Sequence, residues 1–191
     1  KGIVMFLNSL TFLLLYSFLL GPVHAATKDG VSMPDEITLQ GETLKLNGLG
    51  IRRATFFNVH VYVGGLYLKA KTQKVDKFLN SSNIKHIKMH FVRDVDRDDI
   101  IEGWEEDFEN AVPAKRRQKI QNKIDQFNDS MAMMEEGDVI KITFHPKKVT
   151  YTIRDEGPFN IRGETFCRAL LSVWFINAKD QGLKKGLLGK Q

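Results

Sequence analysis

Polar and aromatic side chains alternate between residues 52 and 62, and this stretch is the best suited to chemistry. In a regular strand alternate side chains point to the same face, so Arg52, Phe56, Asn58, His60 and Tyr62 would share one face of a sheet. In an apolar cleft, the guanidinium of the first residue could hold a carboxylate through paired, charge-assisted hydrogen bonds beside the phenol of the last. The alternative interpretation is that this polar face is simply exposed to solvent and binds nothing.

The sequence carries no motif that is typical of a familiar enzyme class. It has no glycine loop for phosphates, no His-Glu-x-x-His zinc motif and no Gly-x-Ser-x-Gly segment. His86 and His90 would share a strand face, but they lie two pleats apart and no third ligand can be named for a metal ion. We therefore expect no metal site and no cofactor.

The cysteine content and the distribution of charge limit the kinds of site and partner that the protein can have. The single cysteine, Cys167, excludes an internal disulfide, and its apolar surroundings predict a buried thiol rather than a nucleophile. The net charge of +5 could attract nucleic acid. However, the basic residues are interleaved with acids, and the densest basic group, at 115–119, fits a solvated helix face equally well. We expect no nucleic-acid partner.

Residues 1–25 have the pattern of a signal peptide. Residues 3–20 are nearly all apolar, Gly21 and Pro22 break any helix, and 23–25 offer a cleavage site with small side chains. An uncleaved anchor is the alternative, because the run approaches the ~20 residues that span a bilayer. We expect cleavage after Ala25, or else after Ala26, which leaves a domain at 26–191 with no stable membrane span in a periplasmic or secreted location.

The elements that must position the polar face are strands arranged around helical segments. Residues 37–46 alternate around Gln40 and Gly41, which predicts a hairpin, and 47–50 are expected to form a glycine-rich turn. A long β-rich stretch then runs over 52–69, where Gly64 and Gly65 indicate a bulge, a bend or the close approach of another backbone.

The rest of the chain alternates helical and strand patterns. Helical spacing predicts a short helix within 71–81, one helix from Asp96 to Val112, a second from Pro113 to Met134, and a last one over 163–177. Strands are expected at 84–92, 139–145 and 148–154. With 42% hydrophobic and 27% charged residues, these patterns predict an α+β fold in which helices cover one side of a large antiparallel sheet.

These segments, in this order, resemble the chalcone isomerase family, and in particular its bacterial exported branch, over about residues 31–189. The similarity rests on Gly48-x-Gly50-x-Arg52, on Val-Tyr-Val-Gly-Gly-Leu-Tyr-Leu at 61–68, on the two-helix segment from Asp96, and on the last helix through Trp174 to 187–189. The resemblance implies an open-faced β-sandwich with a ligand cleft between the large antiparallel sheet and the helices.

The family contains isomerases that close chalcones and non-catalytic proteins that hold fatty acids. The resemblance implies that Arg52 corresponds to the arginine that both groups use and that Tyr62 lies near the tyrosine with which the fatty-acid binders hold a carboxylate. The isomerase's tyrosine and asparagine have no counterpart within 94–103, and its hydroxyl residue on the last helix falls near Arg168. With Asn58 and His60 from the polar face, these residues form the predicted ligand site.

Three functions remain open. The first is a non-catalytic binder of a fatty acid or a similar small apolar acid, which is the interpretation that the missing isomerase residues favour. The second is an isomerase or lyase acting on a small phenolic or enone substrate, in which Arg52 would stabilise an oxyanion and Tyr62 would donate a proton or order water. The third is a structural or interaction protein of the cell envelope whose cleft is filled by its own side chains. The sequence indicates no particular oligomeric state.

Overall fold

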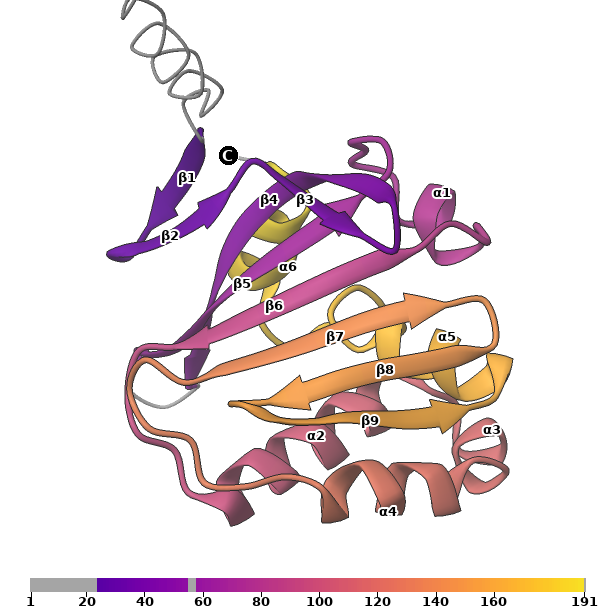
Figure 1. The fold of residues 1–191 in the computed structure, drawn as a ribbon. Coiled ribbons are helices and arrows are strands. Elements are labelled where there is room, and N and C mark those ends of the chain that lie inside the picture. The colour runs from indigo at the N-terminus through magenta and orange to yellow at the C-terminus, as the bar shows by residue number, and fades with distance from the viewer. Residues whose placement is uncertain (1–23, 55–57, 191) are drawn as a thin grey trace, which may run out of the picture.

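A curled antiparallel sheet with helices against one face forms the frame of the molecule (Figure 1). The structure is a computed structural model that describes residues 24–54 and 58–190. Its strands are β1 (Ala25–Lys28), β2 (Val31–Pro34), β3 (Glu36–Leu39), β4 (Glu42–Ala54), β5 (Val59–Leu68), β6 (Lys85–Phe91), β7 (Val139–His145), β8 (Lys148–Ile153) and β9 (Glu156–Arg162). Its helices are α1 (Val75–Leu79), α2 (Arg97–Ala111), α3 (Ala114–Gln118), α4 (Gln121–Asp129), α5 (Glu164–Ser172) and α6 (Gln181–Leu187).

The strands follow one another along the chain and across the sheet. Within the described ranges, β3 to β9 form a seven-stranded sheet in sequential order, and each neighbouring pair is antiparallel. The first two strands pair separately as a hairpin. This arrangement confirms the predicted α+β class with a large antiparallel sheet and covering helices.

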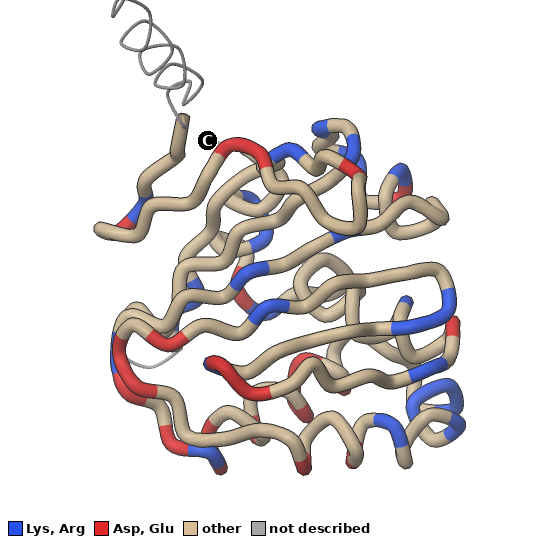
Figure 2. Tube along the Cα trace, in the orientation of Figure 1, with Lys and Arg blue, Asp and Glu red and all other residues tan. Residues whose placement is uncertain are grey.

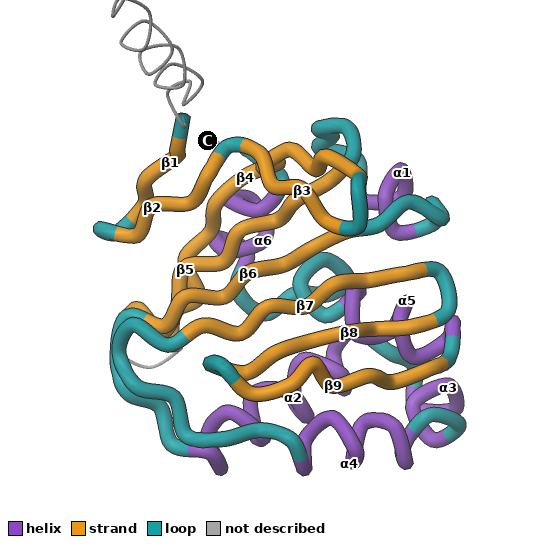
Figure 3. Tube along the Cα trace, in the orientation of Figure 1, coloured by secondary structure: helices purple, strands orange, loops and turns teal. Residues whose placement is uncertain are grey.

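The two faces of the sheet are buried to different extents, and the helices lie against one of them (Figure 3). In β6, Ile87, Met89 and Phe91 join the large core beneath the helices, whereas His86 and Lys88 point to the other side, as the alternation of the sequence predicts. On that side a small cluster, which includes Met33 and Tyr67, packs between the β1–β2 hairpin and the sheet. The main core therefore lies between sheet and helices, where the ligand cleft is expected.

Residues 47–50 form part of β4, so the expected glycine-rich turn is wrong. The glycines have another role, because α6 crosses directly over them. A methyl group on Gly48 would overlap the carbonyl oxygen of Gly186, and one on Gly50 would overlap that of Leu183. In β5, a methyl group on Gly65 would likewise meet the sulfur of Met33, so the expected close approach there comes from a side chain.

The helical segments are shorter than their periodicity predicts. The helix expected from Pro113 to Met134 is divided into α3 and α4 and ends at Asp129, with a non-helical backbone at Ile120 between the two. Met134 lies beyond the helix and pairs with Val95. The last predicted helix stops at Ser172, and α6 follows as a separate helix that sequence periodicity did not indicate.

The predicted signal segment lies outside the described residues, apart from its last residues at 24 and 25. Within the described ranges, no helix is both long enough and apolar enough to cross a membrane.

Candidate functional site

Arg52 and Tyr62 face each other across two neighbouring strands. The prediction of one continuous strand is wrong, because β4 ends at Ala54 and β5 begins at Val59. Asn58, with a φ of 54°, has the left-handed conformation that asparagine tolerates better than most residues. The two predicted site residues are nevertheless direct cross-strand partners, with a register shift immediately after Arg52. Pairing across a hairpin, rather than alternation along one strand, therefore brings them together.

The guanidinium of Arg52 is already paired with a carboxylate. Its Nη1 donates a hydrogen bond to Oδ1 of Asp107 on α2, over 3.3 Å. The side chains are only 16% and 10% exposed, so water screens the pair poorly. Burial raises the pKa of Asp107, and the neighbouring guanidinium partly offsets this effect. Burial also opposes the charge of Arg52, but Tyr62, Asp107 and Asp180 outweigh burial and raise its pKa.

The phenol of Tyr62 is buried beside two aromatic side chains. Its oxygen accepts a hydrogen bond of 3.1 Å from the indole Nε1 of Trp174, and its ring lies 5.7 Å from that of Phe91. Burial raises the pKa of Tyr62 strongly, more than the nearby Arg52 lowers it. The phenol therefore stays neutral and keeps its proton, which makes it a hydrogen-bond donor and not a base.

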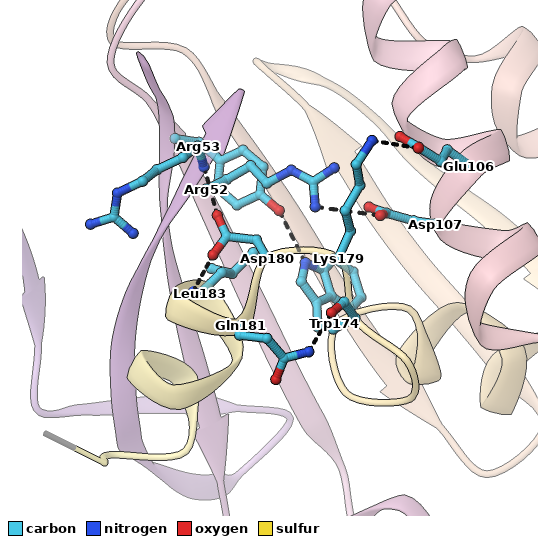
Figure 4. A network of polar contacts seen from close by, with 11 residues as sticks. Arg52, Arg53, Glu106, Asp107, Trp174, Lys179, Asp180, Gln181 and Leu183 are labelled. Carbon is cyan, nitrogen blue, oxygen red and sulfur yellow. Dashed lines mark hydrogen bonds and ion pairs between the residues drawn. The ribbon is translucent and has the colours of Figure 1, made fainter. Parts of the chain in front are cut away.

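A short polar network fixes the loop that carries Trp174 against the strands (Figure 4). Asp180 accepts a hydrogen bond from the backbone N–H of Arg53 and also caps the start of α6 through Leu183. Lys179 forms an ion pair with Glu106, the residue before Asp107 on α2. The helix, the loop and the strand β4 are thus held together around the Arg52 guanidinium.

Aromatic side chains fill the space between sheet and helices next to this pair. The rings of Trp104 and Trp174 meet edge to face at 5.5 Å, and Trp104 meets Phe127 in the same way at 5.1 Å. These three side chains are at most 4% exposed. The cleft that the resemblance implies is therefore closed here, and neither Arg52 nor Tyr62 lines the hollows of about 1100, 890 and 490 Å³ found elsewhere.

The other predicted site residues lie in two different places, so the predicted grouping on one face is wrong. Asn58 and His60 line an open hollow of about 1100 Å³ near the β1–β2 turn, where the imidazole lies 2.7 Å from Asp29. Arg168 is exposed on α5 and lines a groove of about 890 Å³ between that helix and the end of α2. The register shift after Arg52, which pairs Arg53 with His60, separates His60 from Tyr62. Phe56, also predicted on the polar face, lies outside the described residues.

Sequence reasoning missed Asp107 as a partner of Arg52. A signal for it exists, because Asp107 lies three residues after Trp104 and next to Phe108 on the apolar stripe of α2, and it is 7% exposed. A carboxylate on a buried helix face needs a cationic partner. The sheet face opposite that stripe offers Arg52.

The comparisons with known proteins agree with this architecture. A family model described as chalcone isomerase-like matches residues 25–189. Among solved structures, the chain is similar to a fatty-acid binding protein of Arabidopsis thaliana, with 16% sequence identity and a TM-score of 0.64. That match covers 86% of this chain and 96% of the plant protein, whereas no curated protein sequence matches. The chain therefore belongs to the chalcone isomerase-like family.

Proposed function

We propose that this protein is a non-catalytic binder of a fatty acid or a similar small apolar acid, whose carboxylate takes the place of Asp107 at Arg52. The observation that carries the proposal is the Arg52–Asp107 pair itself, because a carboxylate is already accommodated 3.3 Å from the guanidinium. The neutral phenol of Tyr62, the cross-strand partner of Arg52, would donate the second hydrogen bond.

The apolar part of the ligand would enter the aromatic layer beside Trp104 and Trp174. These large side chains meet edge to face and leave no room between them for an apolar chain, so binding requires that the loop carrying Trp174 moves away from α2. The hydrogen bond from Trp174 to Tyr62 would break in the same step and free the phenol for the ligand. The ligand therefore replaces two internal partners at once.

Two further observations favour binding over catalysis. An isomerase needs residues that hold the reacting oxygen in a near-attack position, and residues 94–103 contain neither the tyrosine nor the asparagine that would do so. In addition, the similar plant structure is named as a fatty-acid binding protein. Both support a carrier or a sensor as the role of this chain.

The proposed location is the periplasm or the medium, after removal of the signal peptide, as in the bacterial exported branch of the family. The apolar run at 3–20 and the cleavage site at 23–25 support export. N-terminal sequencing of the protein recovered from the periplasm of a producing cell tests this proposal. A mature chain that begins at Ala26 or Thr27 is expected, whereas an intact leader in the membrane fraction would contradict it.

Binding is tested with delipidated protein titrated with dodecanoate and hexadecanoate in a calorimeter. Saturable binding is expected for the unaltered chain and for Arg53→Gln, and it should vanish in Arg52→Gln. The two substitutions remove the same charge from adjacent residues of β4, but only the guanidinium of Arg52 contacts a carboxylate in the core. Equal binding by all three proteins, or none by the unaltered chain, would reject the proposal.

One observation favours the envelope structural protein as a second candidate. Asp107 and Trp174 already bind the polar groups of Arg52 and Tyr62, as expected of a core that needs no ligand. The loss of stability in Arg52→Gln does not distinguish the candidates, because the substitution leaves Asp107 without its partner in both. The calorimetric titration does, since a purely structural protein binds neither fatty acid.

A further inference from the structure

A hollow of about 490 Å³ lies between α1 and the adjoining ends of β5 and β6. Five of its lining residues are lysines and none is acidic: Lys69, Lys71, Lys74, Lys77 and Lys85. Figure 2 shows the basic positions gathered along the segment that leads from β5 into α1. We call this hollow the lysine pocket. It does not include Arg52 or Tyr62, so its role is independent of the proposed acid-binding site.

Lys85 is the feature that distinguishes this pocket from an ordinary basic surface. It is the first residue of β6 and only 5% exposed, on the face that carries Ile87 and Met89. Its ammonium group donates to the backbone carbonyl of Ser81, which also lines the pocket. An ammonium group has three N–H donors, and no carboxylate in the described part of the chain forms an ion pair with this one.

A buried ammonium without an opposite charge is costly, because burial removes most of its hydration. Burial lowers the pKa of Lys85 accordingly, although the nearby Cys167 thiol partly offsets the effect. A methionine would fill the same position without this cost. The retained charge, directed into a pocket with free volume, therefore points to a partner that is itself negatively charged.

The rim of the pocket carries further positive charge. Lys71, Lys74 and Lys77 are exposed, and they form no ion pair with any described residue. Lys69 lies 3.8 Å from Glu42, and both side chains are exposed. Asp76 lies on α1 between Lys74 and Lys77 in sequence, but it does not line the pocket. Five lysines against these two acids leave the lysine pocket with an excess of positive charge that a singly charged ion would not balance.

We propose that the lysine pocket binds a phosphate-type oxyanion, with Lys85 at its base and Lys74 and Lys77 at its rim. A phosphate monoester carries close to two negative charges at neutral pH and three strong acceptor oxygens. It therefore matches several ammonium groups better than one carboxylate does, and lysine commonly binds phosphate as a point charge. Free phosphate or a phosphomonoester and a lipid phosphate headgroup share this chemistry.

The first experiment titrates the full chain with inorganic phosphate and follows its amide resonances by NMR. Saturable shifts are expected in the backbone around Lys74 and Lys85. Lys85→Met should weaken binding by at least about tenfold, the effect of losing one charge-assisted hydrogen bond. Lys141→Met is the matched control, because it removes the same charge from the exposed side of β7. Its effect should stay within about twofold.

A double variant, Lys74→Gln with Lys77→Gln, keeps the test decisive if Lys85→Met fails to fold. Both rim side chains are exposed, so folding should be unaffected, while phosphate affinity should fall at least about fivefold. The second arm measures cosedimentation with phosphatidylcholine vesicles that contain or lack phosphatidic acid. Binding that requires phosphatidic acid and is lost in the double variant assigns the site to a lipid headgroup, and phosphate binding without vesicle binding assigns it to a free phosphate compound.

The proposal is overturned if neither arm gives saturable binding, or if Lys141→Met weakens binding as much as the pocket variants do. The second result would mean that net charge alone attracts the anion. Dodecanoate binding is unaffected by any of these outcomes, because Arg52 lies outside the lysine pocket. The two proposals therefore fail or succeed separately.

Discussion

Arg52 and Lys85 are both largely buried cations on strands of the same sheet, yet their surroundings differ. Arg52 has a carboxylate within 3.3 Å, from a helix more than fifty residues away in sequence. Lys85 has only a nearby backbone carbonyl, and the hollow above it is lined with other lysines. One region is electrostatically complete within the chain and densely packed, whereas the other is neither.

The difference suggests how each region can use a ligand. At Arg52 an anion must compete with Asp107, so binding depends on an exchange of carboxylates and on the displacement of aromatic side chains. At Lys85 an anion meets no internal competitor in the described residues, and binding removes a cost that the folded chain already bears. Substitutions in the Arg52–Asp107 pair should therefore lower the stability of the fold, whereas substitution of Lys85 should leave the stability unchanged or raise it slightly.

The largest effect is expected from Asp107→Ala. Removal of one partner from a buried ion pair leaves the other charge uncompensated, which costs about 3–5 kcal/mol of unfolding free energy. Glu106→Ala is the control, because its ion pair with Lys179 is a third or more exposed and should contribute less than about 1 kcal/mol. Urea unfolding of both variants measures the difference, and equal losses would remove the distinction between the buried and exposed pairs.

His86 is a third buried basic side chain, and its lowered pKa leaves it neutral in the folded protein at neutral pH. Burial, followed by the charges of Lys141 and Lys88, lowers the pKa of His86 to about 4. Below about pH 6.5 the imidazole of His86 takes up a proton in the unfolded chain but not in the folded one. The free energy of unfolding should therefore fall between pH 6.5 and about 4, by roughly 3 kcal/mol. Unfolding of His86→Gln over this pH range should lack that slope. Parallel pH profiles for the two proteins would contradict the assignment.

An intermediate effect is expected where α6 crosses β4 at Gly48 and Gly50. A methyl group on Gly48 would overlap the backbone of Gly186, so Gly48→Ala should cost about 1–3 kcal/mol as α6 is pushed away from the strand. Gly103→Ala on α2 is the matched control, since nothing lies within 4 Å of its added methyl group. In a helix this change should stabilise by up to about 1 kcal/mol. Thermal unfolding of both variants measures the contrast, and a stabilised Gly48→Ala would show that α6 does not lie as described.

The smallest effect is expected from Lys85→Met, which should leave stability unchanged or raise it by less than about 1 kcal/mol. The pH dependence is more specific. Because the pKa of Lys85 is lowered in the folded state, the unfolded chain holds its proton to higher pH, and the stability of the unaltered chain should rise as pH rises toward 10.5. The variant should lack this rise. A marked loss of stability in Lys85→Met at neutral pH would instead make this lysine a structural residue.

Local patterns were sufficient to predict most of the fold. Alternation identified β6 with its correct buried face, turn residues identified the β3–β4 hairpin, and helical spacing identified α2. Each of these features depends on residues close together in sequence. By contrast, a turn was predicted at Gly48 and Gly50, where β4 continues. The partner that requires those glycines, α6, lies more than 130 residues away in sequence.

The candidate site was predictable only in part, for a similar reason. Arg52 and Tyr62 were paired correctly although the strand between them was not continuous, because both are directed to the helix side in the hairpin as well. The position of His60 was predicted wrongly. The register shift pairs His60 with Arg53 and Tyr62 with Arg52, so the two side chains face opposite sides of the sheet. Asp107 depends on a contact with a strand that is distant in sequence, which periodicity does not report. The lysine pocket is lined by residues within 68–85, but its closure around α1 is likewise not visible in the periodicity.

The central claim, that Asp107 holds the place of a ligand carboxylate at Arg52, is tested most directly by the affinity of Asp107→Asn for dodecanoate. This substitution keeps the size of the side chain but removes the competing charge, with Glu106→Gln as the neighbouring control. Calorimetry should show affinity raised at least about tenfold in Asp107→Asn and unchanged in the control. An unchanged or lower affinity in Asp107→Asn, with the fold intact, would contradict the claim and leave Arg52–Asp107 as an internal ion pair.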